Sequence, residues 1–169
     1  TGDGCGLLIR RPEAFLRALA AETGIALAAG ARFASGLVFL PDQVLLAQRC
    51  RETLEHELRR AGLSILGWRT PPTDMRVCGE LARQTLPSIE QIYVQAGAGQ
   101  DEESFNLALF LARRRSERQL RDIADYYVVS LSAHAIGYKG MVLPDKLARF
   151  YPDLQRDDLA SSAIVFHQR

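Results

Sequence analysis

The sequence predicts an α+β or layered α/β architecture, because strands and helices alternate irregularly along a single domain. A chain of 169 residues with 47% hydrophobic content can bury a core of that size. Runs with alternating apolar residues, typical of strands, are separated by runs with an apolar residue every three or four positions, typical of helices. Residues 126–143 hold two runs rich in Val, Tyr, Leu and Ile around a Ser-Ala-His junction, which indicates a β-hairpin inside a sheet.

The first residues predict a tight turn that leads into a buried strand. Glycines occupy alternate positions in residues 1–6 and precede the apolar residues 7–9. A dinucleotide-binding GxGxxG loop follows a strand and opens a helix, so the order found here argues against that kind of site. Pro12 suits the first turn of a helix that ends at Gly24.

Apolar periodicity and flanking turn residues predict the elements that follow. In the first long helix, Asp42 is a candidate N-cap and Gly62 a terminator. We expect strands at residues 33–40, 63–68, 89–94 and 162–166, and helices at residues 42–61, 77–85, 101–121 and 144–151.

The helix that starts at residue 101 has acidic residues in its first turn and arginines in its later turns, an order that matches the helix macrodipole. Such a basic run could bind phosphate. No aromatic residues interleave for base stacking, so we interpret it as the solvated and ion-paired end of a helix. The arginines are Arg113, Arg114, Arg115, Arg118 and Arg121.

The charge balance favours neither nucleic acid nor a membrane as a partner. The 21 basic and 20 acidic residues leave a net charge of +1, and no apolar run approaches the roughly 20 residues that cross a bilayer. The sequence also lacks the pattern of a signal peptide. The three cysteines, Cys5, Cys50 and Cys78, are far apart and form no CxxC pair, which suggests a reducing, cytoplasmic compartment.

Few residues stand out as candidates for chemistry. The sequence has no HExxH, GxSxG or P-loop motif. Cys5 could be a nucleophile, but a buried thiol beside a strand is the better interpretation, and His56 is expected to be a solvated surface residue. Thr1 could use its own α-amine as a base, although both ends of the chain look cut, so that its terminal position is accidental. Arg169, after His167, is best suited to bind a carboxylate through two hydrogen bonds.

Four segments together resemble a known family. The chain is similar, over its full length and in the same order, to the glutamine amidotransferase (type 2) domain of the glutamate synthase large subunit. The segments are TGDGCGLLI at residues 1–9, LGWRTPP at 66–72, SLSAHAIGYKGMVLPDKLARFYPDL at 130–154 and SSAIVFHQR at 161–169.

This resemblance implies an N-terminal-nucleophile hydrolase fold, here a partial four-layer αββα sandwich. It also implies that glutamine is hydrolysed to glutamate and ammonia. In the family the ammonia meets 2-oxoglutarate in the remaining synthase domains of the parent chain, which carry FMN and an iron–sulfur cluster. Whether ferredoxin or a pyridine nucleotide supplies the electrons stays open.

The resemblance also implies roles for particular residues. His167, Gln168 and Arg169 match the family's HQR segment, in which the arginine holds the carboxylate of glutamine and the histidine supports it. The family's catalytic cysteine would lie before Thr1 and its oxyanion-hole Asn-Gly pair after Arg169. We therefore expect residues 1–169 to be a partial amidotransferase domain, truncated at both ends and inactive alone.

A second hypothesis remains open from the residues themselves. The chain could be a non-catalytic α+β module that binds a small acid or another protein domain through the arginine-rich helix and the predicted hairpin. Lys139 and Gly140, at the end of that hairpin, are expected to have a structural role near the glutamine pocket.

Overall fold

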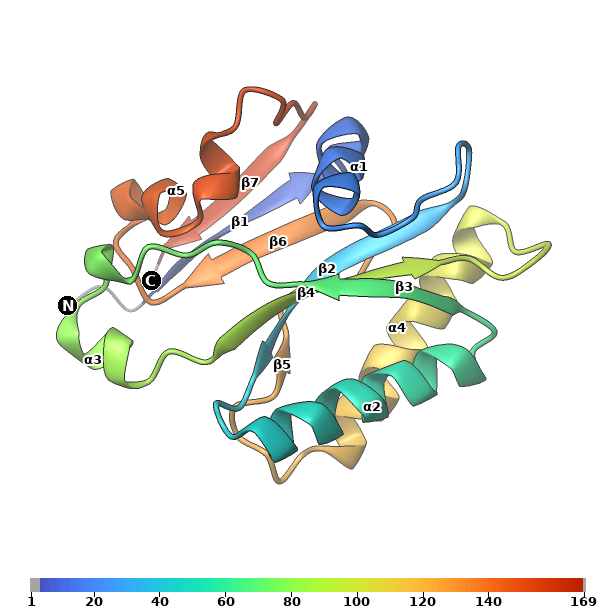
Figure 1. Cartoon of the computed structure of the whole chain (residues 1–169), viewed down its shortest axis with the longest axis horizontal. Coiled ribbons are helices and arrows are strands. Elements are labelled where there is room, and N and C mark those ends of the chain that lie inside the picture. Colours follow the sequence, from blue (N-terminus) through green and yellow to red (C-terminus); the bar gives the residue numbers. More distant parts are fainter. Residues whose placement is uncertain (1–3, 169) are drawn as a thin grey trace.

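The computed structural model describes residues 4–168 and shows an α+β fold with two antiparallel sheets (Figure 1). The strands are β1 (Cys5–Arg10), β2 (Phe33–Leu40), β3 (Ser64–Arg69), β4 (Ser88–Gln95), β5 (Tyr127–Val128), β6 (Ala135–Gly140) and β7 (Ile164–Gln168). The α-helices are α1 (Glu13–Glu22), α2 (Val44–Arg60), α3 (Glu80–Gln84), α4 (Glu102–Gln119) and α5 (Leu147–Phe150). Short 3-10 helices are η1 (Met75–Val77), η2 (Pro144–Lys146) and η3 (Pro152–Gln155).

The two sheets draw on different parts of the chain. The three-stranded sheet has the order β6-β1-β7, so its central strand comes from the start of the sequence and both neighbours from the end. The four-stranded sheet has the order β3-β4-β2-β5, and all of its pairings are antiparallel. The three-stranded sheet therefore forms only once the two ends of the chain meet.

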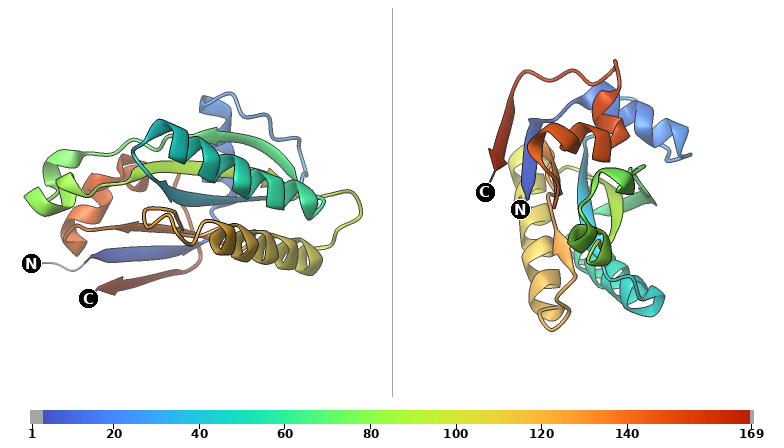
Figure 2. Two further views of the ribbon diagram at one scale, coloured as in Figure 1. Left: turned by 90° about the horizontal axis from the view of Figure 1, so that it is seen from below. Right: turned by 90° about the vertical axis from the view of Figure 1, so that its left-hand side faces the viewer.

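Helices α2 and α4 lie side by side over one face of the four-stranded sheet (Figures 1 and 2). Val38 and Ile92 from the sheet pack there against Leu54 of α2 and Leu109 of α4, and all four side chains are fully buried. Burial of each such side chain stabilises the fold by about 1.5–3 kcal/mol.

A second core fills the space between the two sheets. Leu37 and Tyr93 point there from the four-stranded sheet, and Ile9 and Ile136 from the three-stranded sheet. Residues of α1 and α5 complete this core at its margin. The layers run from helices to sheet to sheet, which agrees with the α+β sandwich that the resemblance implies.

The predicted hairpin at residues 126–143 is wrong. Its first run, β5, pairs with β2 in the four-stranded sheet, whereas its second run, β6, pairs with β1 in the other sheet. The segment between β5 and β6 crosses from one sheet to the other and passes very close to the backbone of β2 at Gly36. Only glycine fits there, because a Cβ at Gly36 would lie 1.7 Å from the backbone oxygen of Ser130. The hydroxyl of Ser130 in turn accepts a hydrogen bond of 2.8 Å from the backbone N–H of Gly137.

Other element boundaries differ in detail. Gln43, rather than Asp42, is the N-cap of α2, and the helix ends before Gly62, whose φ of +79° favours glycine as predicted. The helix predicted at residues 77–85 is shorter, since only α3 (Glu80–Gln84) is α-helical there and Val77 is the last residue of η1. The last strand starts at Ile164, two residues later than residue 162.

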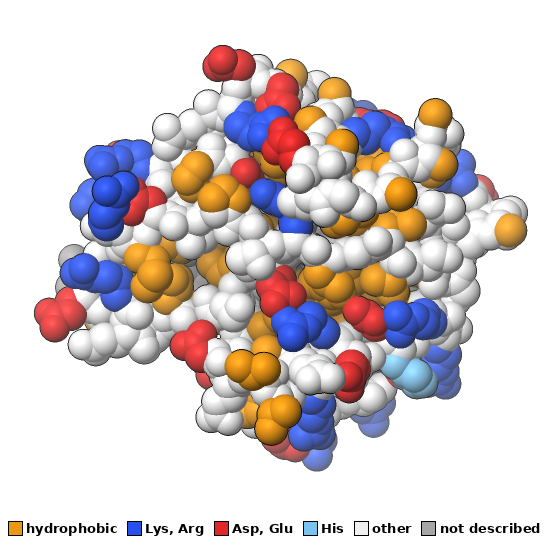
Figure 3. All heavy atoms as spheres, in the orientation of Figure 1, with side chains coloured by type: hydrophobic (Ala, Val, Ile, Leu, Met, Phe, Trp, Pro, Cys, Tyr) orange, Lys and Arg blue, Asp and Glu red, His pale blue; other side chains and the backbone are white. Residues whose placement is uncertain are grey.

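The surface charge and the hydropathy of the helices agree with the nearly balanced charge and ordinary hydrophobic content of the sequence. On the face seen in Figure 3, acidic and basic side chains lie among one another rather than in one large patch of a single sign. Within residues 4–168, no helix combines the length and the apolar character needed to cross a bilayer.

Candidate functional site

His167, one of the two site residues expected from the sequence, lies on β7, the last strand of the three-stranded sheet in chain order. His167 on β7 pairs with Gly6 on β1, and Gly6 pairs on its other side with Lys139 on β6. Directly paired residues of neighbouring strands point to the same face of a sheet. The three residues therefore form one row across the sheet. Gly6 is in the middle, the cationic side chain of Lys139 lies on one side of it and the imidazole of His167 on the other.

The ring of His167 lies over Gly6. A Cβ at Gly6 would be 2.6 Å from Cε1 of His167 and 3.1 Å from the backbone oxygen of Tyr138, so a side chain cannot be added without displacing the histidine. His167 is exposed, as is the rest of β7. Arg169, the residue assigned to the carboxylate of glutamine, lies outside the described residues, and its role stays a prediction.

Lys139 connects the two sheets. Its Nζ lies 5.0 Å from the centroid of the Tyr127 ring, within the range of a cation–π interaction. Tyr127 belongs to β5 of the four-stranded sheet and itself packs against the ring of Phe39. This contact gives Lys139 a structural role, whereas Gly140 has only ordinary van der Waals neighbours around a Cβ position.

The three cysteine thiols are buried and unsuited to nucleophilic attack. The thiol of Cys5 donates a hydrogen bond of 3.2 Å to the backbone oxygen of Val142, and its residue is 2% exposed. Burial raises the pKa of this thiol, and the carboxylate of Asp145 raises it further. Burial also raises the pKa values of Cys50 and Cys78. Because the thiolate is the reactive form, the expectation that Cys5 is a buried structural thiol is confirmed.

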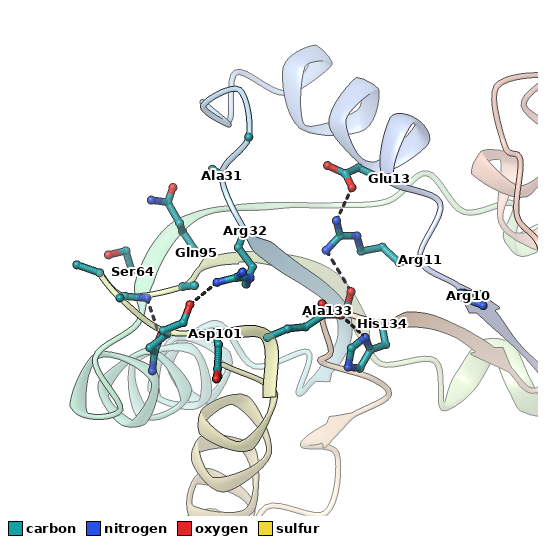
Figure 4. A pocket seen from close by; sticks show the side chains of 17 residues that line it. Arg10, Arg11, Glu13, Ala31, Arg32, Ser64, Gln95, Asp101, Ala133 and His134 are labelled. Atoms are coloured by element: carbon teal, nitrogen blue, oxygen red, sulfur yellow. Dashed lines mark hydrogen bonds and ion pairs between the residues drawn. The ribbon is translucent and has the colours of Figure 1, made fainter. Parts of the chain in front are cut away.

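A polar cavity on the surface was not predicted from the sequence. It has a volume of about 1090 Å³ and opens between the start of α1, the start of β2, the loop from β4 to α4, and the segment before β6 (Figure 4). Its lining includes Arg10, Arg11, Arg32, Glu13 and His134. These residues come from separate segments with no shared spacing, so no sequence motif marks the cavity.

The polar groups of this cavity are largely engaged with one another. Arg11 binds the carboxylate of Glu13 and donates hydrogen bonds to two backbone oxygens, and Arg32 donates to the backbone oxygen of Gln100 (Figure 4). Nδ1 of His134 lies 2.9 Å from the carboxylate of Glu102. The cavity can accept a polar ligand, but it presents no nucleophile beside a base.

No metal centre is formed within the described residues. No cluster of three or more His, Cys, Asp or Glu side chains among residues 4–168 could hold a metal ion. The side chain of His56 is 72% exposed, as expected for a surface histidine, and its Nδ1 lies 3.4 Å from the carboxylate of Glu57.

Comparison with known proteins relates the whole chain to one family. The model of the class-II glutamine amidotransferases matches residues 1–169. The chain is 41% identical to the glutamate synthase [NADPH] large chain of Azospirillum brasilense and 31% identical to that of Bacillus subtilis. It is also 31% identical to ferredoxin-dependent glutamate synthase 1 of Arabidopsis thaliana. Each alignment covers 100% of this chain and 11% of the relative, so the chain spans about a tenth of the length of these proteins.

Proposed function

Because the chain belongs to the class-II glutamine amidotransferases, we propose that it is part of the glutaminase domain of a glutamate synthase. The reaction adds water across the side-chain amide of glutamine: the bond between carbonyl carbon and nitrogen breaks, and glutamate and ammonia leave. The observation that carries the proposal is the match of the family model to all 169 residues. The two layered antiparallel sheets support it.

Amide hydrolysis requires a nucleophile and hydrogen-bond donors for the developing oxyanion. The buried thiols of Cys5, Cys50 and Cys78 cannot supply the nucleophile. We place the nucleophile and the oxyanion donors outside these 169 residues, so that the chain by itself does not hydrolyse glutamine.

The contribution of this chain to the reaction is substrate binding. We assign Arg169 to the α-carboxylate of glutamine, because a guanidinium can donate two parallel hydrogen bonds to a carboxylate. His167 supports that position, since its ring over Gly6 keeps β7 aligned with β1.

In the longer protein we propose that ammonia reacts with 2-oxoglutarate in other synthase domains, with FMN and an iron–sulfur cluster bound there. An iron–sulfur cluster needs several thiolate ligands that converge on one site. Cys5 and Cys78 contribute to the core between the sheets and Cys50 to the core under the helices, and all three thiols are buried. The residues described here therefore do not fit such a cluster. The relatives are named for NADPH or for ferredoxin, so either reductant is compatible with the proposal.

A non-catalytic module that binds a small acid or another domain has less support. That hypothesis used the predicted hairpin, which is not formed. It also used the arginine-rich helix, where Arg113 and Arg114 are paired with Glu117.

A glutaminase assay of the full-length protein tests the proposal. Arg169→Ala should raise the KM for glutamine about 10- to 100-fold, as expected for loss of a charged hydrogen-bonding partner. Arg115→Ala, on the exposed surface of α4, is the matched control and should leave KM unchanged. Cys5→Ala should retain activity. Loss of glutamine hydrolysis in Cys5→Ala, or an unchanged KM in Arg169→Ala, would contradict the proposal.

A further inference from the structure

The hydroxyl of Tyr138 is buried without a hydrogen-bond partner in the described part of the chain. Tyr138 lies on β6 and is 0% exposed, and its Oη has no partner among residues 4–168. Buried polar groups of native proteins are paired with other protein groups or with ordered water, because an unpaired group is costly. Burial raises the pKa of Tyr138, so the hydroxyl keeps its proton and can both donate and accept a hydrogen bond.

A second polar group without a partner lies on β3. Nε of Arg69 is buried and donates to no acceptor within the described chain. The other two nitrogens of the guanidinium are engaged, since Nη1 donates to Gln91 and to Asp153, and Nη2 donates to Asp153. The bond from Nη2 to Oδ1 of Asp153 is 3.4 Å long, so this oxygen can accept a further, shorter hydrogen bond.

The packing around η3 brings these groups into one region of the interior. The ring of Tyr151 packs edge-on against that of Tyr138, with 5.1 Å between the centroids, and Asp153 follows two positions later in η3. Besides burial, the carboxylate of Asp153 raises the pKa of Tyr138 and the guanidinium of Arg69 lowers it, so the hydroxyl lies within range of both charges. Neither of them is its hydrogen-bond partner. A small molecule between them would satisfy the hydroxyl and Nε together.

We propose that one water molecule is bound in the interior between Tyr138 and the ion pair of Arg69 with Asp153. The water accepts hydrogen bonds from Nε of Arg69 and from the hydroxyl of Tyr138, and it donates to Oδ1 of Asp153. Three hydrogen bonds are typical of a buried water.

The surroundings favour water over other occupants. Arg69 and Asp153 compensate each other's charge at 2.8 Å, and both side chains are only 5% exposed, so an ion would add an uncompensated charge. Tyr138 and Tyr151 are fully buried, which restricts the occupant to a very small molecule. Because residues of this chain already enclose the site, another part of a longer protein cannot reach it.

The water connects the two sheets. It ties β6 of the three-stranded sheet to β3 of the four-stranded sheet and to η3. Strand β6 pairs with β1, and β1 pairs with β7, which carries His167. The water therefore stabilises the strand order on which the position of β7 depends.

A crystal structure of the full-length protein, at a resolution that shows ordered waters, tests the proposal without any substitution. It should show one water at about 2.7–3.2 Å from Oη of Tyr138 and from Nε of Arg69. A direct hydrogen bond between Tyr138 and Asp153 overturns the proposal. An interior with no water at this position overturns it as well.

Hydrogen exchange on the full-length protein gives a second test, because the direction of the change depends on whether the hydroxyl is paired. If the water satisfies the hydroxyl, Tyr138→Phe removes a hydrogen bond, and the amides of β6 should exchange about five- to tenfold faster than in wild type. If the hydroxyl has no partner, the same substitution removes an unpaired polar group. Exchange then stays unchanged or slows, and this result overturns the proposal.

Tyr127→Phe is the matched control for the exchange experiment. Tyr127 is 40% exposed, so water from the solvent can reach its hydroxyl. Phenylalanine keeps an aromatic ring beneath Nζ of Lys139, which lies 5.0 Å from the ring centroid. The amides of β6 should therefore exchange in this variant as they do in wild type.

Discussion

The guanidinium of Arg69 and the carboxylate of Asp153 form an ion pair of 2.8 Å in the interior, although 84 positions separate them in the sequence. Both side chains are only 5% exposed. Arg69 also donates a hydrogen bond of 2.7 Å to the side-chain oxygen of Gln91, whose amide donates to Ser35 and to the hydroxyl of Tyr93. This network ties η3 to β3, β4 and β2.

Breaking this ion pair should strongly destabilise the fold. Asp153→Asn leaves the charge of Arg69 buried without an anionic partner, and removal of one member of a buried pair costs about 3–5 kcal/mol. Urea unfolding of the variant should show a loss of that size in the free energy of unfolding. Arg76→Ala is the control, because the side chain of Arg76 is 90% exposed in its ion pair with Asp74, and this variant should unfold almost like wild type. Equal effects of the two substitutions would show that the buried pair does not anchor η3.

The crossing between the sheets depends on Gly36. An alanine there would place its Cβ 1.7 Å from the backbone oxygen of Ser130, so the backbone of the crossing segment must move. We expect Gly36→Ala to lower the free energy of unfolding by at least about 3 kcal/mol. At Gly140, a strand residue with negative φ, the nearest atom to a Cβ is 3.5 Å away. Gly140→Ala should therefore be neutral or stabilise the fold by about 0.5 kcal/mol, since it restricts the unfolded chain. If both alanines are tolerated alike in thermal unfolding, the close approach at Gly36 is not required.

Local periodicity was sufficient to locate most elements, but it did not specify their partners. The strand at residues 33–40 was predicted with its observed bounds, because its apolar run is stopped by Pro41. The runs around Ser130 carry the same local features as a hairpin. Their separation into two sheets depends on Gly36, 94 positions earlier, and on the pairing of β6 with β1. A sequence pattern that spans a few residues holds no information about such distant contacts.

For the candidate site too, the sequence located individual residues but not the contacts between them. The resemblance located His167 and Arg169, and the structure places His167 on β7. The ring of His167 over Gly6 joins opposite ends of the chain, which no spacing rule could anticipate. The cavity lined by Arg11, Arg32 and His134 was missed because its residues meet only in the folded chain.

The contact between Gly6 and His167 gives the last prediction. Gly6→Ala should destabilise the fold by about 1–3 kcal/mol, because the new methyl group pushes the imidazole, and with it β7, away from β1. His167→Ala removes the ring that the methyl group would strike. The double variant should therefore lose less stability than the sum of the two single variants, with a coupling of about 0.5–3 kcal/mol in a double-mutant cycle measured by urea unfolding. Some of the loss should persist in the double variant, since the backbone oxygen of Tyr138 also lies 3.1 Å from the Cβ position. Strictly additive losses would mean that Tyr138, and not His167, explains why residue 6 is glycine.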